Sequence, residues 1–341
     1  MTDIVITGVG RVRPDRVARA LDTGPREGRS PGTLAHQVSG FAPEERLGRK
    51  VARFNSRATL FAMDAAESAM ADARLTVTDD NRDRTGIAVG TTVGSIASTV
   101  TFGWDSFNRE RPYVVNAALF PNTVLNTTAG ALAIRTGMRG ANSTVAGGPL
   151  AALQALRHAQ MSLSQRHTDS VLAGAAEEVT GASLWWWEAA FGTGPVGEGA
   201  AMFVLKRGAD AQAVGRRVLA RLGSVVVRAA DPREPEAVGR VARLALDRAG
   251  LDPADVRLAV VRTTGDEETD TAQHEALTKL LGTEPVYHED VMGDCYSAHS
   301  ALQMAWLLER EPSDRGPALV VAVDPEGAVG AVVLDQGGVT R

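Results

Sequence analysis

Apolar and polar positions divide the chain into strands and helices that follow one another in a regular order. An Ile-Val-Ile run within residues 3–8 precedes a glycine, which is typical of a strand buried in a covered sheet. Residues 57–75 place apolar side chains three or four positions apart, which predicts a helix that packs on one face. Residues 23–40 are rich in glycine, proline, arginine and serine, and this composition predicts a loop.

The alternation continues to the end of the chain in two similar series. The first series contains expected strands at 85–90, 170–173 and 200–205 and expected helices at 129–136 and 151–163. After a seam near 207–215, the second series contains expected strands at 224–227, 257–261, 318–323 and 328–334 and expected helices at 234–249, 271–281 and 299–308. We therefore expect a covered, mixed sheet and one compact unit, with an N-terminal half at 1–210 and a C-terminal half at 211–341.

The composition is that of a globular protein. Of the 341 residues, 44% are hydrophobic and 23% are charged, which is enough apolar material for a sizeable core. The formal net charge of -5 argues against nucleic-acid binding, because neutralising phosphates requires a surplus of lysine and arginine. The single cysteine, Cys295, excludes a disulfide within the chain, and the six histidines lack neighbours at metal-ligand spacing. We expect neither a metal nor a cofactor.

The chain also lacks the sequence features of secreted and membrane proteins. Residues 1–10 carry an acidic residue where a secretion signal would be basic, and their apolar run is too short for such a signal. No stretch reaches the roughly 18 uninterrupted apolar residues that a membrane span needs. We therefore expect a cytoplasmic protein without a membrane partner.

Six segments of the sequence carry a specific pattern. They are MTDIVITGVG at the start, RFNSRATLFAMDAAESAMADARL from Arg53, GTTVGS from Gly90, PNTVLNTTAGALAIRTGMRGAN from Pro121, LAGAAEE from Leu172 and VGEGAAMFVL from Val196. Taken in this order, they resemble the ketosynthase family of fatty-acid and polyketide synthesis. The resemblance implies an α/β, thiolase-like fold with two duplicated βαβαβαββ halves in a five-layer α-β-α-β-α arrangement. It also implies a dimer formed along the edge of the first half.

Three positions carry catalysis in active members of that family, namely a cysteine at a turn that opens a buried helix and two histidines from the second half. Counting without gaps from the flanking segments on both sides places the cysteine position on Pro149. Proline has no nucleophile, and it has no N–H to contribute to an oxyanion hole. The histidine positions fall on Arg262, or its neighbour Thr263, and on Asp294. The resemblance therefore predicts a chain without the catalytic residues of the family.

The segments that form the substrate site in the family also differ here. The last glycine-rich loop, at 324–328, contains a proline and a glutamate. The stretch at 177–196 is shorter than in typical members and contains Trp185, Trp186 and Trp187. Because three adjacent tryptophans are costly to leave exposed, we expect them in the core or at an interface, with the substrate mouth rebuilt or closed.

A scaffold that is kept while its catalytic residues are replaced predicts a role for its surface. In type II polyketide synthases, a catalytic ketosynthase forms a heterodimer with an inactive homologue, the chain-length factor, and the acyl carrier protein is recruited mainly by the catalytic subunit. The growing acyl chain runs along the shared interface. A helix expected at 96–108 would line this tunnel with one face, which carries Ala97, Val100, Trp104 and Phe107. Bulky Trp104 would stop elongation and small Ala97 would leave space before it, unless these side chains only pack at the interface.

Proline at the cysteine position, where aromatic polyketide systems have glutamine, and the reduced length favour a partner in a highly reducing, polyene-forming type II system. Two other classes of function stay open. One is a residual acyltransferase or hydrolase that uses Asp294 or Cys295, with His299 four residues after the cysteine. The other is a homodimeric binding or regulatory protein without a ketosynthase partner.

Overall fold

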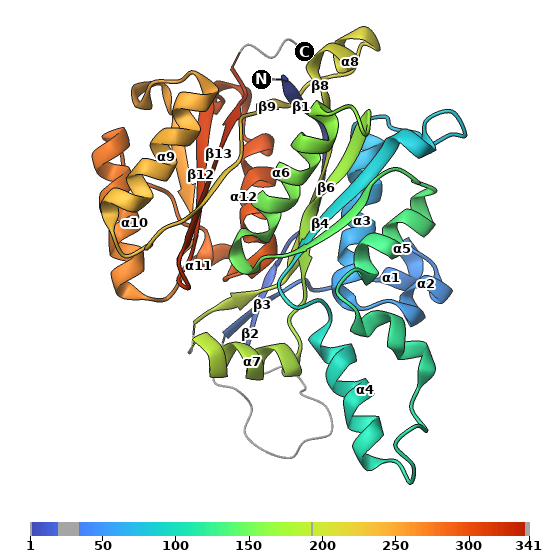
Figure 1. Ribbon diagram of the computed structural model, residues 1–341. Helices are drawn as coiled ribbons and strands as arrows, with labels where there is room; N and C mark the ends of the chain where they lie inside the picture. The colour runs from blue at the N-terminus through green and yellow to red at the C-terminus, as the bar shows by residue number, and fades with distance from the viewer. Residues whose placement is uncertain (1, 20–33, 192–193, 338–341) are drawn as a thin grey trace.

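The computed structural model describes residues 2–19, 34–191 and 194–337, and it shows five layers (Figure 1). Two sheets enclose a central pair of helices, and each sheet carries a further pair of helices on its outer face. The central pair is α6 (Ala151–Ser164) and α12 (His299–Glu309). The outer pairs are α3 (Arg57–Asp72) with α5 (Thr127–Thr136), and α9 (Pro235–Ala249) with α10 (Glu267–Leu281). Within the described ranges, no helix combines the length and the apolar composition needed to cross a membrane.

The sheet of the first half is mixed. Its strands are β1 (Ile4–Val12), β4 (Thr85–Thr91), β5 (Asn142–Ala146), β6 (Ser170–Glu177) and β8 (Gly199–Arg207). They lie in the order β5-β4-β6-β8-β1, with β4 parallel to β5 and β6, and β8 antiparallel to β6 and β1. Among the described strands, β5 therefore forms one edge of this sheet.

The second half repeats this arrangement. Its strands are β10 (Val226–Ala229), β11 (Leu258–Val261), β12 (Pro317–Asp324) and β13 (Ala328–Asp335), and Val286 forms a parallel bridge to Val260 of β11. Counted from Val286, the order is bridge-β11-β12-β13-β10, with the same parallel and antiparallel senses as in the first half. The short β9 (Ala220–Leu222) pairs with both β1 and β13 and joins the two sheets. The predicted thiolase-like duplication is confirmed, whereas the division at 210 stays a prediction.

Burial on both sides explains why the central helices and the strands are so apolar. Leu153 and Leu156 of α6 and Met304 and Leu307 of α12 are buried in one cluster that contacts the inner faces of both sheets. Because each sheet is covered on both faces, its strands are nearly continuous apolar runs. The helices begin close together, since η3 (Gly148–Leu150) before α6 packs against η5 (Tyr296–Ala298) before α12.

Smaller elements lie around the five layers. A three-stranded sheet of β2 (Arg16–Arg19), β3 (Leu34–Gln37) and β7 (Val196–Gly197) lies next to α7 (Gly181–Phe191) (Figure 1). The remaining elements are α1 (Pro43–Arg46), α2 (Arg49–Phe54), η1 (Arg82–Arg84), α4 (Ile96–Asn108), η2 (Ala117–Thr123), α8 (Gly208–Ala213), η4 (Pro253–Asp255), α11 (Glu289–Met292) and η6 (Pro312–Asp314). In Figure 1, α4 projects away from the layers.

Most of the predicted elements are confirmed to within a few residues, and one is wrong in part. The loop predicted at 23–40 contains the strand Leu34–Gln37, because these residues pair with β2 and β7 and bury Ala35 and His36. Such long-range pairing leaves no trace in local composition. Residues 23–33 lie outside the described residues. The seam near 207–215 contains the short helix Gly208–Ala213.

Candidate functional site

The turn that opens α6 contains Pro149. Gly148 has a φ of 52°, which a residue with a side chain rarely adopts, and Pro149 follows it as a buried residue of the first turn. The fixed φ of proline suits this position, where no N–H is required. A Cβ built on Gly148 would lie 3.6 Å from Oδ2 of Asp324, so the end of β12 faces the same turn.

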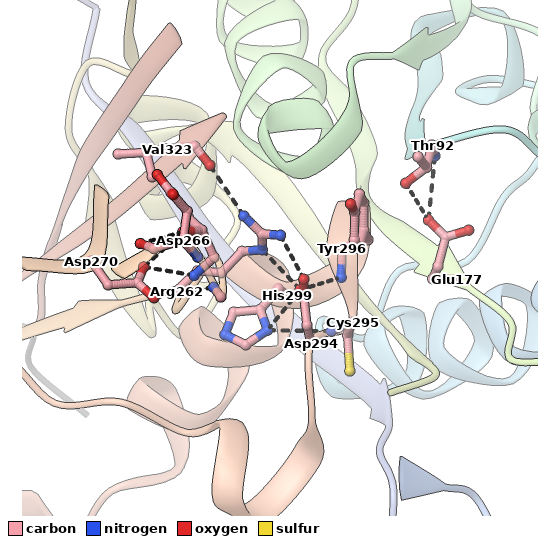
Figure 2. Close-up of polar contacts among 12 residues, drawn as sticks. Thr92, Glu177, Arg262, Asp266, Asp270, Asp294, Cys295, Tyr296, His299 and Val323 are labelled. Atoms are coloured by element: carbon pink, nitrogen blue, oxygen red, sulfur yellow. Dashed lines mark hydrogen bonds and ion pairs between the residues drawn. The ribbon is translucent and has the colours of Figure 1, made fainter. Parts of the chain in front are cut away.

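A buried ion pair lies beside this turn and joins Arg262, which follows β11, to Asp294 (Figure 2). Nε of Arg262 donates to Oδ1 of Asp294 at 2.8 Å, and Nη2 donates to Oδ2 at 2.5 Å. Nη1 of Arg262 also donates to the carbonyl oxygen of Val323 at 3.2 Å, and the Arg262 side chain is only 2% exposed. Burial by itself raises the pKa of Asp294, but the Arg262 guanidinium, together with His299 and the N–H of Tyr296, holds that pKa below its ordinary value of 3.8. Both groups therefore stay charged and paired near neutral pH.

Aromatic side chains fill the space next to the ion pair. The backbone N–H of Tyr296 donates to Oδ1 of Asp294 at 2.9 Å, and the guanidinium carbon of Arg262 lies 5.0 Å from the centre of the Tyr296 ring. The Tyr296 ring in turn meets Trp187 at a centroid distance of 5.1 Å and Trp186 at 6.3 Å. Trp187 is buried in the core, which is one of the two environments expected from the sequence, whereas Trp185 is exposed.

Two consecutive glutamates end β6 and reach the segment before α4. Oε2 of Glu177 accepts hydrogen bonds from Oγ1 of Thr92 at 2.7 Å (Figure 2) and from Oγ of Ser297 at 2.6 Å. Oε2 of Glu178 accepts from the backbone N–H of Ala58 at 3.0 Å, and its Oε1 accepts from Oγ of Ser95 at 2.7 Å. Burial raises the pKa of Glu177 from 4.5 to about 7, against the effect of the Ser297 and Thr92 hydrogen bonds, and burial also raises the pKa of Glu178.

These contacts of Glu177 and Glu178 were not predicted from the sequence. Two acidic residues directly after an apolar strand, as in LAGAAEE, are nevertheless a detectable signal, because carboxylates are rarely buried without partners. A third carboxylate, that of Glu198, is fully buried and pairs with Arg57 through two hydrogen bonds of 2.8 and 2.7 Å. Together these residues form a polar layer between α3, the start of α4 and η5.

The helix α4 spans the residues predicted from the sequence, Ile96–Asn108. None of its thirteen residues, all of which the structure describes, is buried. Val100, Trp104 and Phe107 are 51%, 42% and 86% exposed, whereas Ala97 is half-buried. The neighbouring η2 packs against α4, and the Phe120 ring lies 5.8 Å from the ring of Phe102, which is on the opposite side of α4 from Trp104. We call the three exposed residues Val100, Trp104 and Phe107 of α4 the apolar face.

The sequence profile described as "Beta-ketoacyl synthase, N-terminal domain" matches residues 5–185. This chain belongs to the beta-ketoacyl synthase family. It is 28% identical over 327 residues to the actinorhodin polyketide putative beta-ketoacyl synthase 2 of Streptomyces coelicolor, an alignment that covers 83% of this chain and 78% of the relative.

Solved structures of the beta-ketoacyl synthase family agree with this assignment. The structure of the ishigamide ketosynthase/chain length factor contains a chain 32% identical to this one, with a TM-score of 0.86, and the match covers 98% of this chain and 100% of that chain. The fold is also shared by a chain in the structure of a type II PKS acyl-carrier protein in complex with its ketosynthase bound to the hexaketide. The TM-score is 0.82 at 19% identity. That match covers 98% of this chain and 99% of the other.

Counting along the sequence predicts the cysteine position of the family at Pro149 and its two histidine positions at Arg262, or its neighbour Thr263, and at Asp294. In the structure, Arg262 and Asp294 contact each other directly, and η3 with Pro149 packs against η5, which begins two residues after Asp294. The fold thus brings all three predicted residues to one place.

Cys295 and His299, the candidate pair for nucleophilic catalysis, contact each other. The buried thiol of Cys295 lies 3.4 Å from the carbonyl oxygen of Met292 and 3.8 Å from that of Glu198. The backbone N–H of Cys295 donates to Nδ1 of His299 at 3.4 Å. The two carbonyl oxygens beside the thiol cannot act as the base that activates a thiol for nucleophilic catalysis.

Proposed function

We propose that this chain is the non-catalytic chain-length factor of a type II polyketide synthase and forms a heterodimer with a catalytic ketosynthase. The observation that carries the proposal is the buried ion pair of Arg262 and Asp294 beside Pro149. Condensation requires a nucleophile for the acyl thioester and groups that stabilise the developing oxyanion. Pro149 supplies neither a nucleophile nor an N–H, and the two charged side chains neutralise each other.

The exposed surface of the first half supports the heterodimer. The strand β5 lies at an edge of the sheet, where its outer N–H and C=O groups can pair with another strand. The apolar face adds aromatic and aliphatic side chains that a partner would cover, with Phe107 the most exposed. The similarity to the ishigamide ketosynthase/chain length factor supports a ketosynthase as that partner.

The acyl carrier protein then reaches the complex mainly through the ketosynthase subunit. The shared fold with a ketosynthase solved in complex with its type II PKS acyl-carrier protein is consistent with this arrangement. Proline at position 149, where aromatic systems have glutamine, favours a highly reducing system over an aromatic one. The length of the acyl product would be set by the tunnel between the two subunits.

In the proposed heterodimer, α4 lines that tunnel with Ala97, Val100, Trp104 and Phe107. The helical spacing puts these residues on one face, and three of them are substantially exposed. Trp104 is the bulkiest residue of this set, and inserting further methylene groups against such a side chain costs about 1 to 3 kcal/mol. Trp104 would therefore end elongation.

Co-expression with the cognate ketosynthase tests both parts of the proposal. We expect the two chains to co-purify and Trp104→Ala to lengthen the acyl products, as measured by mass spectrometry. The matched control is Tyr287→Ala, which removes a partly exposed aromatic side chain in the second half and should leave product length unchanged. Unchanged products from a normally assembled Trp104→Ala complex would contradict gating. Condensation by the purified chain alone, or a homodimer that ignores the ketosynthase, would contradict the proposed function.

A further inference from the structure

The position of α4 depends on its N-terminal end rather than on burial. None of its thirteen residues, all within the described part of the chain, is buried, and the helix packs on η2 and α7, which are themselves peripheral elements. At its N-cap, however, Ser95 is buried and accepts a hydrogen bond from the backbone N–H of Ser98 at 3.3 Å. The same hydroxyl donates to Oε1 of Glu178 at 2.7 Å. The first turn of α4 is therefore tied to the end of β6.

The preceding residue of β6 makes a second connection to the same segment. Glu177 accepts from both Oγ1 and the backbone N–H of Thr92, at 2.7 and 3.3 Å, three residues before Ser95. Glu177 is itself contacted by Ser297, which donates at 2.6 Å from η5. The backbone N–H of Tyr296, the residue before Ser297, donates to Asp294. Hydrogen bonds and the short segments 296–297 and 92–95 thus connect the ion pair at Asp294 to the start of α4.

We propose that the ion pair of Arg262 and Asp294 beside Pro149 helps to position α4. Glu177 and Glu178 act as positioning residues that determine where Trp104 lies in the tunnel. This inference rests on the proposed function for its consequence, product length, but not for its structural part. Glu177 and Glu178 touch no part of the apolar face in the contacts described above, and they would act on chain length only through α4.

The geometry makes the position of Trp104 sensitive to this connection. Trp104 lies nine residues after Ser95, which corresponds to about 14 Å along a helix that rises 1.5 Å per residue. A tilt of about 10° at the N-cap would therefore move Trp104 by roughly 2.4 Å. Such a shift is comparable with the length of one added two-carbon unit, so a small change at the buried end would change which products fit.

Two substitutions break the connection without touching the apolar face. Ser95→Ala removes the hydroxyl that bonds Glu178, and Glu178→Gln leaves one acceptor oxygen where the carboxylate offers two, to Ser95 and to the N–H of Ala58. Ser95→Thr retains the hydroxyl and serves as the conservative variant. The matched control is Asp270→Asn, which alters a part-buried carboxylate that accepts from the N–H of Thr264 at 2.7 Å in the second half.

The test is hydrogen-deuterium exchange and product analysis on the heterodimer of full-length chains. Because a buried hydrogen-bonding group left without its partner costs about 1 to 3 kcal/mol, we expect exchange across residues 96–108 to accelerate by about fivefold or more in Ser95→Ala and Glu178→Gln. We also expect their products to shift or broaden in length. Ser95→Thr and Asp270→Asn should match the wild type in both measurements.

Wild-type exchange at 96–108 together with wild-type products in Ser95→Ala and Glu178→Gln would overturn the inference. If Trp104→Ala changes product length but these two variants do not, the positioning role fails and the proposed function stands. If Trp104→Ala has no effect in an assembled complex, gating by Trp104 fails, whereas the non-catalytic partner role is not affected. Exchange at 96–108, which can be measured on this chain alone, then decides the positioning role by itself.

Discussion

Removing one partner of the buried ion pair should destabilise the protein strongly. Asp294 is the carboxylate that both Nε and Nη2 of Arg262 contact, and the Arg262 side chain is 2% exposed. Asp294→Leu would leave the guanidinium in the interior without this counterion, and Arg262→Met would do the same to the carboxylate. Breaking a buried pair in this way costs about 3 to 5 kcal/mol of unfolding free energy.

The double variant distinguishes a charge effect from a loss of packing. Arg262→Met with Asp294→Leu removes both charges and substitutes apolar side chains, and such replacements are often neutral or stabilising. The two single costs should therefore not add, and the double-mutant cycle should give a coupling energy of about 3 kcal/mol or more. Arg262 lowers the pKa of Asp294 in the folded state, so this contribution is complete above pH 3.8 and is lost as the pH falls through the lower folded-state value. Measurement at pH 7 captures it fully.

Urea unfolding followed by circular dichroism measures these free energies. The control is Asp247→Asn, which breaks the exposed pair between Arg243 and Asp247 on α9 and should cost no more than about 0.5 kcal/mol. Single variants at Arg262 and Asp294 that cost less than about 1 kcal/mol, with no coupling, would refute the view that this pair is a buried charge pair.

Three further changes test other parts of the molecule. Because the pKa of Glu177 is raised by burial from 4.5 to about 7, its contribution to stability is lost as the pH rises through this range, by about 3 kcal/mol in all. The melting temperature of Glu177→Gln should therefore rise relative to that of the wild type between pH 5 and pH 8. A difference in melting temperature that does not change with pH would contradict this. Pro149→Cys should restore a thiol but no condensation, because neither histidine position carries an imidazole, and substantial activity in a malonyl condensation assay would show this reasoning to be wrong. Phe107→Asp should weaken ketosynthase binding at least about a hundredfold in calorimetry while leaving the melting temperature of this chain unchanged, and undiminished affinity would remove Phe107 from the interface.

Local patterns predicted the repeating elements well because those elements are set by periodicity. The helix Arg57–Asp72 and the strand Thr85–Thr91 lie where the spacing of apolar residues placed them. The helix Ile96–Asn108 also matches its predicted bounds, and the predicted face is largely exposed. The strand Leu34–Gln37 was missed, since its pairing partners lie far away in the sequence.

The candidate site was predicted only as a set of separate positions. Counting along the chain identified Pro149, Arg262 and Asp294, but it gave no indication that the last two form an ion pair. It also gave no role to Glu177 and Glu178, because their partners are 85 and 83 residues away at Thr92 and Ser95.

By itself, the sequence determined the order of strands and helices, the family, and the chemical groups that Pro149, Arg262 and Asp294 do not have. These properties follow from residue identity and short-range spacing. Only the tertiary structure decided that a guanidinium and a carboxylate neutralise each other beside Pro149, and that two buried glutamates connect η5 to the start of α4. Such contacts join residues far apart in the chain, and their strength depends on exclusion of water, which exists only once the layers have packed.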